Sequence, residues 1–114
     1  MSASIRVNTV ALADRLLIEV AGEISTHEST VLRAALREAL ATKPRLLVVS
    51  LAGVTFMATA GVATLVECLQ GANKAQCKLV LCGMEQRVKS VFEISRLTKV
   101  FTIVERADDA PSPS

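Results

Sequence analysis

Two nearly continuous apolar runs, separated by an amphipathic helical pattern, constrain the fold of this chain most strongly. They are RLLVVSL, residues 45–51, and CKLVLCG, residues 77–83. Runs with so little polar alternation are typical of strands at the centre of a sheet or covered on both faces. Upstream, residues 4–10 and 15–21 alternate apolar and polar side chains, which predicts an antiparallel hairpin. Gly22 is expected to end its second strand.

Three amphipathic patterns fill the intervals between these strands. The first follows STHE, in which Ser25 and Glu28 have the spacing of a capping box. The second begins near Thr59 and repeats apolar residues at helical spacing to about Ala72. The third covers EQRVKSVFEISRL, residues 85–97. The inward positions of this third helix are expected to be Val88, Val91, Phe92 and Ser95.

With a last strand at residues 101–105, the order of elements is β-β-α-β-α-β-α-β. Alternation from the second strand onward predicts an α/β fold with a mixed, mostly parallel sheet of about five strands, three to four helices and an antiparallel N-terminal strand. The 114 residues are expected to form one domain, residues 1–106. The tail ADDAPSPS, residues 107–114, can give one helical turn, but Pro111 and Pro113 predict a disordered end.

Composition excludes several classes of protein. Hydrophobic residues make up 51% of the chain and charged residues 21%, which is not typical of a disordered protein. No apolar run reaches the roughly 20 residues of a membrane span, and MSASIRVNTV lacks the pattern of a secretion signal, so we expect a cytoplasmic protein. The formal charge of +2 does not indicate direct nucleic-acid binding. The basic residues of the third helical region are interpreted as a solvated face: Arg87, Lys89, Arg96 and Lys99.

Cysteine and histidine usage gives little sign of catalysis. Cys68, Cys77 and Cys82 lack C-x-x-C spacing, so reduced thiols are predicted, with Cys68 and Cys82 packed in apolar surroundings. The only histidine, His27, is expected in solvent in the first turn of a helix; nothing completes a metal site with it, and we expect no metal or cofactor. A small redox or nucleotide-binding enzyme, supported only by Cys77 and Cys82, is a minor alternative to a protein without enzymatic activity.

The junction MATAG, residues 57–61, is the candidate functional site, and the hydroxyl of Thr59 is its only reactive group. Functional groups of open α/β sheets gather where strands end and helices begin. Ala58, Ala60 and Gly61 would let another macromolecule approach the backbone closely, with the hydroxyl exposed between them. In the simpler alternative, Thr59 only caps the helix and Gly61 only permits tight packing. The motif lacks the length and the Lys of a nucleotide cradle, and TAG is not a nucleophile elbow.

Three segments carry a resemblance to a known family: VAGEIS, residues 20–25; LLVVSLAGVTFMATAGVATLVECL, residues 46–69; and KLVLCGMEQRVKSVFEISRLTKVFTIVE, residues 78–105. Together they resemble the STAS-domain family and, within it, the anti-sigma factor antagonists of bacteria. The central segment is the most specific. The family usually shows Val-x-Phe/Tyr-Ile/Met-Asp-Ser-Ser-Gly-Leu there.

The resemblance implies a small switch protein with a single-domain STAS fold. Its unmodified form binds an anti-sigma factor that is also a serine/threonine kinase, phosphorylation ends the binding, and a PP2C-type phosphatase restores it. Thr59 then takes the phosphorylated position, Gly61 that of the motif glycine and Val62 that of the apolar residue after it. The partner-binding residues implied are Ser25, Ala58, Thr59, Ala60, Gly61 and Val62.

The chain departs from the family pattern at three of these positions. Ala58 and Ser25 stand where the family often has Asp, and Ala60 replaces the second Ser. A kinase that orients the hydroxyl through a local carboxylate would find none at residues 58 and 25. The alternative function is therefore a non-catalytic STAS subunit of a signalling scaffold or lipid-transport complex, with Thr59 unmodified. The sequence specifies no oligomeric state.

Overall fold

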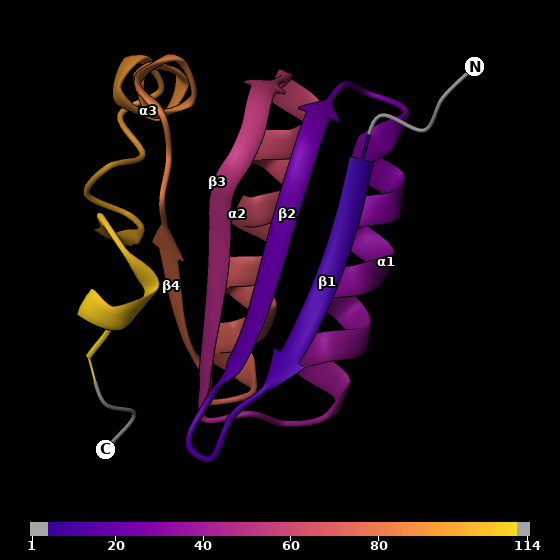
Figure 1. The fold of residues 1–114 in the computed structure, drawn as a ribbon, viewed down its shortest axis with the longest axis vertical. Coiled ribbons are helices and arrows are strands. Elements are labelled where there is room, and N and C mark those ends of the chain that lie inside the picture. Colours follow the sequence, from indigo (N-terminus) through magenta and orange to yellow (C-terminus); the bar gives the residue numbers. More distant parts are fainter. Residues whose placement is uncertain (1–4, 112–114) are drawn as a thin grey trace.

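The computed structural model describes residues 5–111 and shows a five-stranded sheet in the order β1-β2-β3-β4-β5 (Figure 1). Strand β1 is antiparallel to β2, and every other neighbouring pair is parallel. The predicted mixed sheet with an antiparallel first strand is confirmed. The elements are β1 (Ile5–Ala11), β2 (Leu16–Ile24), α1 (Glu28–Ala41), β3 (Leu46–Met57), α2 (Thr59–Lys74), β4 (Lys78–Cys82), α3 (Gln86–Ile94), β5 (Thr102–Val104) and the 3-10 helix η1 (Ala107–Asp109).

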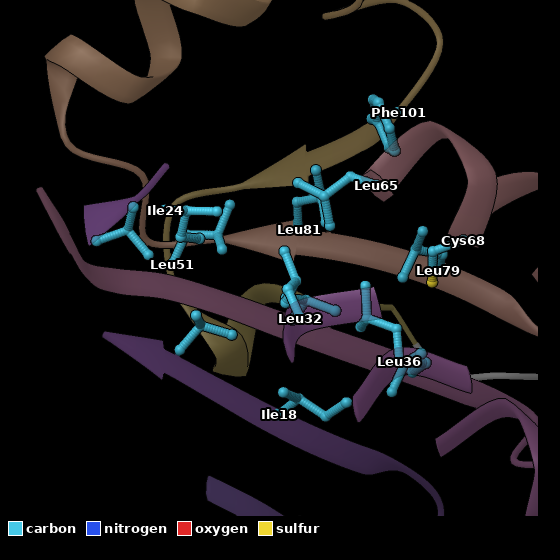
Figure 2. Close-up of a cluster of buried hydrophobic side chains, with 14 of the residues drawn as sticks. Ile18, Ile24, Leu32, Leu36, Leu51, Leu65, Cys68, Leu79, Leu81 and Phe101 are labelled. Carbon is cyan, nitrogen blue, oxygen red and sulfur yellow. The ribbon is translucent and has the colours of Figure 1, made fainter. Parts of the chain in front are cut away.

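Helices α1 and α2 lie side by side on one face of the sheet, and α3 lies beyond the end at which β3 finishes (Figure 1). Parallel neighbours in sequential order are joined by crossovers of one hand, which places the connecting helices on the same side. The main core fills the space between that face and the helices. Figure 2 shows Leu32, Leu36 and Leu65 from the helices pointing toward strand side chains such as Ile18 and Leu81.

The sequence predicts that the second strand ends at Gly22, but the strand continues to Ile24. Gly22 has a φ of 106°, and the register between β2 and β3 shifts between Gly22 and Glu23. A glycine can adopt this left-handed backbone without strain, so it accommodates a bulge and the pairing resumes beyond it. The third strand likewise runs past the predicted end at residue 51, to Met57.

The third helix is shorter than predicted and ends at Ile94. Its end is closed by the N–H of Leu97, which donates to the carbonyl of Phe92 at 2.8 Å, while Arg96 takes a φ of 59°. This arrangement is typical of a helix C-terminus. Ser95 therefore lies after the helix and is exposed, so its predicted inward position is wrong.

The opposite face of the sheet carries a smaller apolar cluster under the C-terminal segment. Ala110, after η1, is 8% exposed and packs with Leu46, Val48, Val80 and Cys82. The predicted helical turn of the tail is thus present as η1. The end of the tail is predicted to be disordered, and its residues 112–114 lie outside the described residues. The boundary between residues 106 and 107 stays a prediction. Within residues 5–111, no helix is long and apolar enough to cross a membrane.

Candidate functional site

The ends of β2 and β3 meet at one edge of the sheet and position the candidate site. Ile24 pairs with Met57, and the N–H of Ala58 donates to the carbonyl of Ile24 at 2.8 Å. Ser25 follows one strand and Thr59 begins the helix after the other. The structure therefore brings together two segments that the sequence analysis assigned to one site.

Thr59 is the first residue of α2, and its side chain is exposed. The N-cap position belongs to Ala58, whose extended backbone has φ −76° and ψ 163°, and no side chain caps this helix end. Within the described part of the chain, the Thr59 hydroxyl has no hydrogen-bond partner. Capping therefore does not explain this threonine, and its oxygen is open to solvent.

The first turn of α2 also presents unpaired backbone donors. The N–H groups of Gly61 and Val62 both donate to the carbonyl of Ala58, at 2.9 and 3.2 Å. Those of Thr59 and Ala60 have no partner among residues 5–111. Because unpaired N–H groups and the helix dipole favour negative charge, an anion attached at Thr59 would be stabilised by its own helix.

Gly61 and Val62 support this surface from inside. Gly61 is buried, and a Cβ there would lie 2.9 Å from Ile24 Cγ2 and closer still to the sulfur of Met57. Val62 is 6% exposed and belongs to the core. Ala58 and Ala60 are half-buried. The surface around the Thr59 hydroxyl is therefore formed by small, apolar side chains.

Ser25 is half-buried, and its hydroxyl donates to the carboxylate of Glu28. Its carbonyl accepts a hydrogen bond from the N–H of Ser29 at 3.0 Å. Ser25 and Glu28 therefore contact one another, but the N-cap residue of α1 is His27 and no side chain caps this helix end, so Ser25 is not the N-cap that the capping-box spacing predicts. His27 is exposed, as predicted, but it is the N-cap residue before α1 and not part of the first helical turn.

A groove at the end of β3 is lined mostly by residues outside the candidate site of the sequence analysis. It has a volume of about 580 Å³, and we call it the Phe56 groove. Phe56 is 50% exposed, whereas Met57, which follows it, is 3% exposed in the core. The groove is lined by Glu23, Thr55, Phe56, Met57, Arg87, Val88 and Val91.

The cysteines are free and buried, which confirms the predicted reduced, packed thiols of Cys68 and Cys82. Burial raises the pKa of Cys68 to about 12 and also raises the pKa values of Cys77 and Cys82. Because the thiolate is the nucleophilic form, these thiols are poorly suited to redox or covalent chemistry at neutral pH. Among residues 5–111, no three His, Cys, Asp or Glu side chains gather in a group that could hold a metal ion.

Comparison with known proteins places this geometry in a family context. A sequence model of the STAS domain matches residues 5–110. An anti-sigma factor antagonist from Mycobacterium paratuberculosis superposes with a TM-score of 0.86 at 22% identity, covering 96% of this chain and 94% of that one. A putative anti-sigma factor antagonist from Thermotoga maritima gives 0.81 at 11% identity, with 90% and 89% covered. The Bacillus cell fate determinant SpoIIAA, in its phosphorylated form, gives 0.68 at 15% identity, with 92% and 95% covered.

Proposed function

This chain belongs to the STAS-domain family, and we propose that it is an anti-sigma factor antagonist that phosphorylation at Thr59 switches off. In its unmodified form it binds a serine/threonine-kinase anti-sigma factor in the cytoplasm and so releases a sigma factor. A PP2C-type phosphatase removes the phosphate and restores binding. The protein catalyses neither step.

The observation that carries this proposal is the exposed hydroxyl of Thr59, which has no partner among the described residues. A kinase must bring this oxygen in line with the γ-phosphorus of ATP. The small side chains of Ala58 and Ala60 on either side leave room for that approach. The oxygen attacks phosphorus, its proton passes to a base of the kinase, and ADP leaves.

The phosphate would block binding locally. A phosphothreonine adds about −1.5 to −2 charges and three acceptor oxygens. The unpaired N–H groups of Thr59 and Ala60 make this charge tolerable for α2 itself. A partner packed on Ser25, Ala58 and Ala60 would instead meet added bulk and a desolvation cost. Gly61 and Val62, the other residues of the predicted interface, would hold that surface in shape from inside.

Phosphorylation in vitro tests the proposal directly. The protein is incubated with ATP and a purified kinase-type anti-sigma factor from the same organism, and mass spectrometry locates the modified residue. We expect one phosphate on Thr59 and none on Thr59→Val, which keeps the shape of the side chain but lacks the oxygen. Phosphate on another residue of the parent protein would refute the assignment of Thr59.

The second candidate function is a non-catalytic STAS subunit of a signalling scaffold or lipid-transport complex, with Thr59 unmodified. Ala58 and Ser25 favour it, because neither supplies a carboxylate to orient the hydroxyl. The neighbouring genes discriminate the two: a kinase-type anti-sigma factor supports the switch, and transporter components support the subunit.

A further inference from the structure

We propose that the Phe56 groove is a second docking site for the same kinase-type anti-sigma factor, which inserts an apolar side chain there and pairs a carboxylate with Arg87. This proposal rests on the proposed function. It assigns to the partner a chemistry that the surface around Thr59 does not specify. The groove would act as an anchor, whereas Thr59 would act as the switch.

The exposure of Phe56 is the first reason. The chain has three phenylalanines. Phe92 and Phe101 are 0% and 4% exposed and meet edge to face, with ring centroids 5.6 Å apart. Phe56 is instead 50% exposed at the rim of a hollow of about 580 Å³. Aromatic side chains at the edge of such hollows are typical anchors of protein interfaces.

Helix α3 extends the apolar surface away from Phe56. Arg87 and Val91 line the groove, and Ile94 lies three residues beyond Val91, on the same side of the helix. Ile94 is 82% exposed. A helix that needed only to cover the core would carry polar residues on this side. The exposed stripe therefore continues the groove and indicates a surface that another protein covers.

The charges lining the groove determine how a segment of the partner is oriented in it. Arg87 is exposed and has no ion pair within residues 5–111. Glu23 lies among the lining residues on β2, across from α3. A complementary segment thus places its carboxylate on the α3 side, next to the Arg87 guanidinium, and keeps acidic groups away from Glu23.

Continuity with Thr59 argues for one partner rather than two. Phe56 and Met57 line the groove, and Ala58 and Thr59 follow them without a loop, since β3 ends at Met57 and α2 begins at Thr59. A protein seated over Thr59 would therefore reach the groove as well. A phosphate on Thr59 adds charge at one end of this surface and leaves the groove unchanged. Substitutions in the groove should then raise Kd for the partner by the same factor in the phosphorylated and the unphosphorylated protein.

The test measures binding of purified variants to the kinase-type anti-sigma factor that phosphorylates the parent protein, by isothermal titration calorimetry. Phe56→Ala is expected to raise Kd at least about tenfold. Its matched control is Leu12→Ala, because Leu12 is also 50% exposed but lies in the turn between β1 and β2. Leu12→Ala should leave Kd within about twofold of the parent value, as expected for a residue outside the interface.

A charge reversal at Arg87 tests the groove independently of Phe56. Arg87→Glu is expected to raise Kd about tenfold, as for loss of one close ion pair, whereas Lys89→Glu, two residues along the helix and outside the groove, should have a much smaller effect. Thermal melts confirm that each variant folds. Parent-like binding by both Phe56→Ala and Arg87→Glu would overturn the groove while leaving the Thr59 switch intact. A parent protein that does not bind this kinase at all would overturn both proposals.

Discussion

The backbone N–H of Ala58 donates to the carbonyl of Ile24 at 2.8 Å and ties the end of β3 to the end of β2. Ser25 and Thr59 lie on either side of this bond, at one edge of the sheet. The proposed phosphorylation site is therefore held by two strands and a helix rather than by a long loop. A group added to Thr59 would project from a rigid surface, which is what a steric and electrostatic switch requires.

Mimicking the phosphate at Thr59 should abolish partner binding. We expect Thr59→Asp to raise Kd for the kinase-type anti-sigma factor at least about a hundredfold, since a buried unpaired charge at an interface costs several kcal/mol. Thr59→Ala should bind as the parent does. The control is Thr9→Asp, which adds the same charge at an exposed position of β1. Equal binding by Thr59→Asp and Thr59→Ala would exclude the switch and favour the scaffold subunit.

The same Thr59→Asp variant should fold at least as stably as the parent. Its carboxylate would lie at the first residue of α2, where the helix dipole and unpaired N–H groups favour an anion by about 0.3–1 kcal/mol. Urea unfolding followed by circular dichroism measures the change. A marked loss of stability would mean that the loss of binding reflects unfolding rather than a local block.

Adding a methyl group at Gly61 should destabilise the fold. The new Cβ would lie 2.9 Å from Ile24 Cγ2 and still closer to Met57, and overpacking of this kind costs about 1–3 kcal/mol. Gly71→Ala in the same helix is the matched control. Its Cβ would meet only Leu40 Cδ1, at 3.2 Å, so we expect a change below about 1 kcal/mol. Equal unfolding free energies for the two variants would contradict the packing described for Gly61.

Restoring a carboxylate beside Thr59 should speed its phosphorylation. In Ala58→Asp, the new side chain follows β3 directly and can accept a hydrogen bond from the attacking hydroxyl. One such charged hydrogen bond in the transition state corresponds to about a tenfold higher rate. Initial rates of phosphate incorporation measure the effect, with Ala58→Asn as the uncharged control. If neither variant exceeds the parent rate, the kinase does not depend on a local carboxylate.

The buried thiols should make stability depend on alkaline pH. Burial raises the pKa of Cys68 in the folded protein to about 12, so folding favours the protonated thiol. This contribution is complete below the unfolded pKa of about 8.5 and is lost as the pH rises toward the folded value. The urea midpoint should therefore fall between pH 8 and pH 11, and less steeply in Cys68→Ala. At pH 8, iodoacetamide should modify the three cysteines quickly only after unfolding.

The sequence predicted the frame of the fold because its signals are local and periodic. The continuous apolar run at residues 45–51 identified the central strand, and helical spacing after Thr59 identified α2. These patterns follow from which side chains one face of an element can bury. Irregular pairing escaped this reasoning. Beyond Ser50, the buried residues of β3 are Leu51, Val54 and Met57, a spacing of three that a regular strand does not show, because two register shifts occur opposite β2.

By itself, the sequence determined the order and direction of the strands, the apolar face of each helix, and a threonine hydroxyl at the start of α2. Only the tertiary structure decided how that hydroxyl is presented. The same residue could have capped the helix, but pairing of Ala58 with Ile24 gives the N-cap position to Ala58 and leaves Thr59 exposed. It also decided that Phe56 faces a groove against α3. Both outcomes depend on the register between strands and on helix placement, which arise from contacts between residues far apart in the chain.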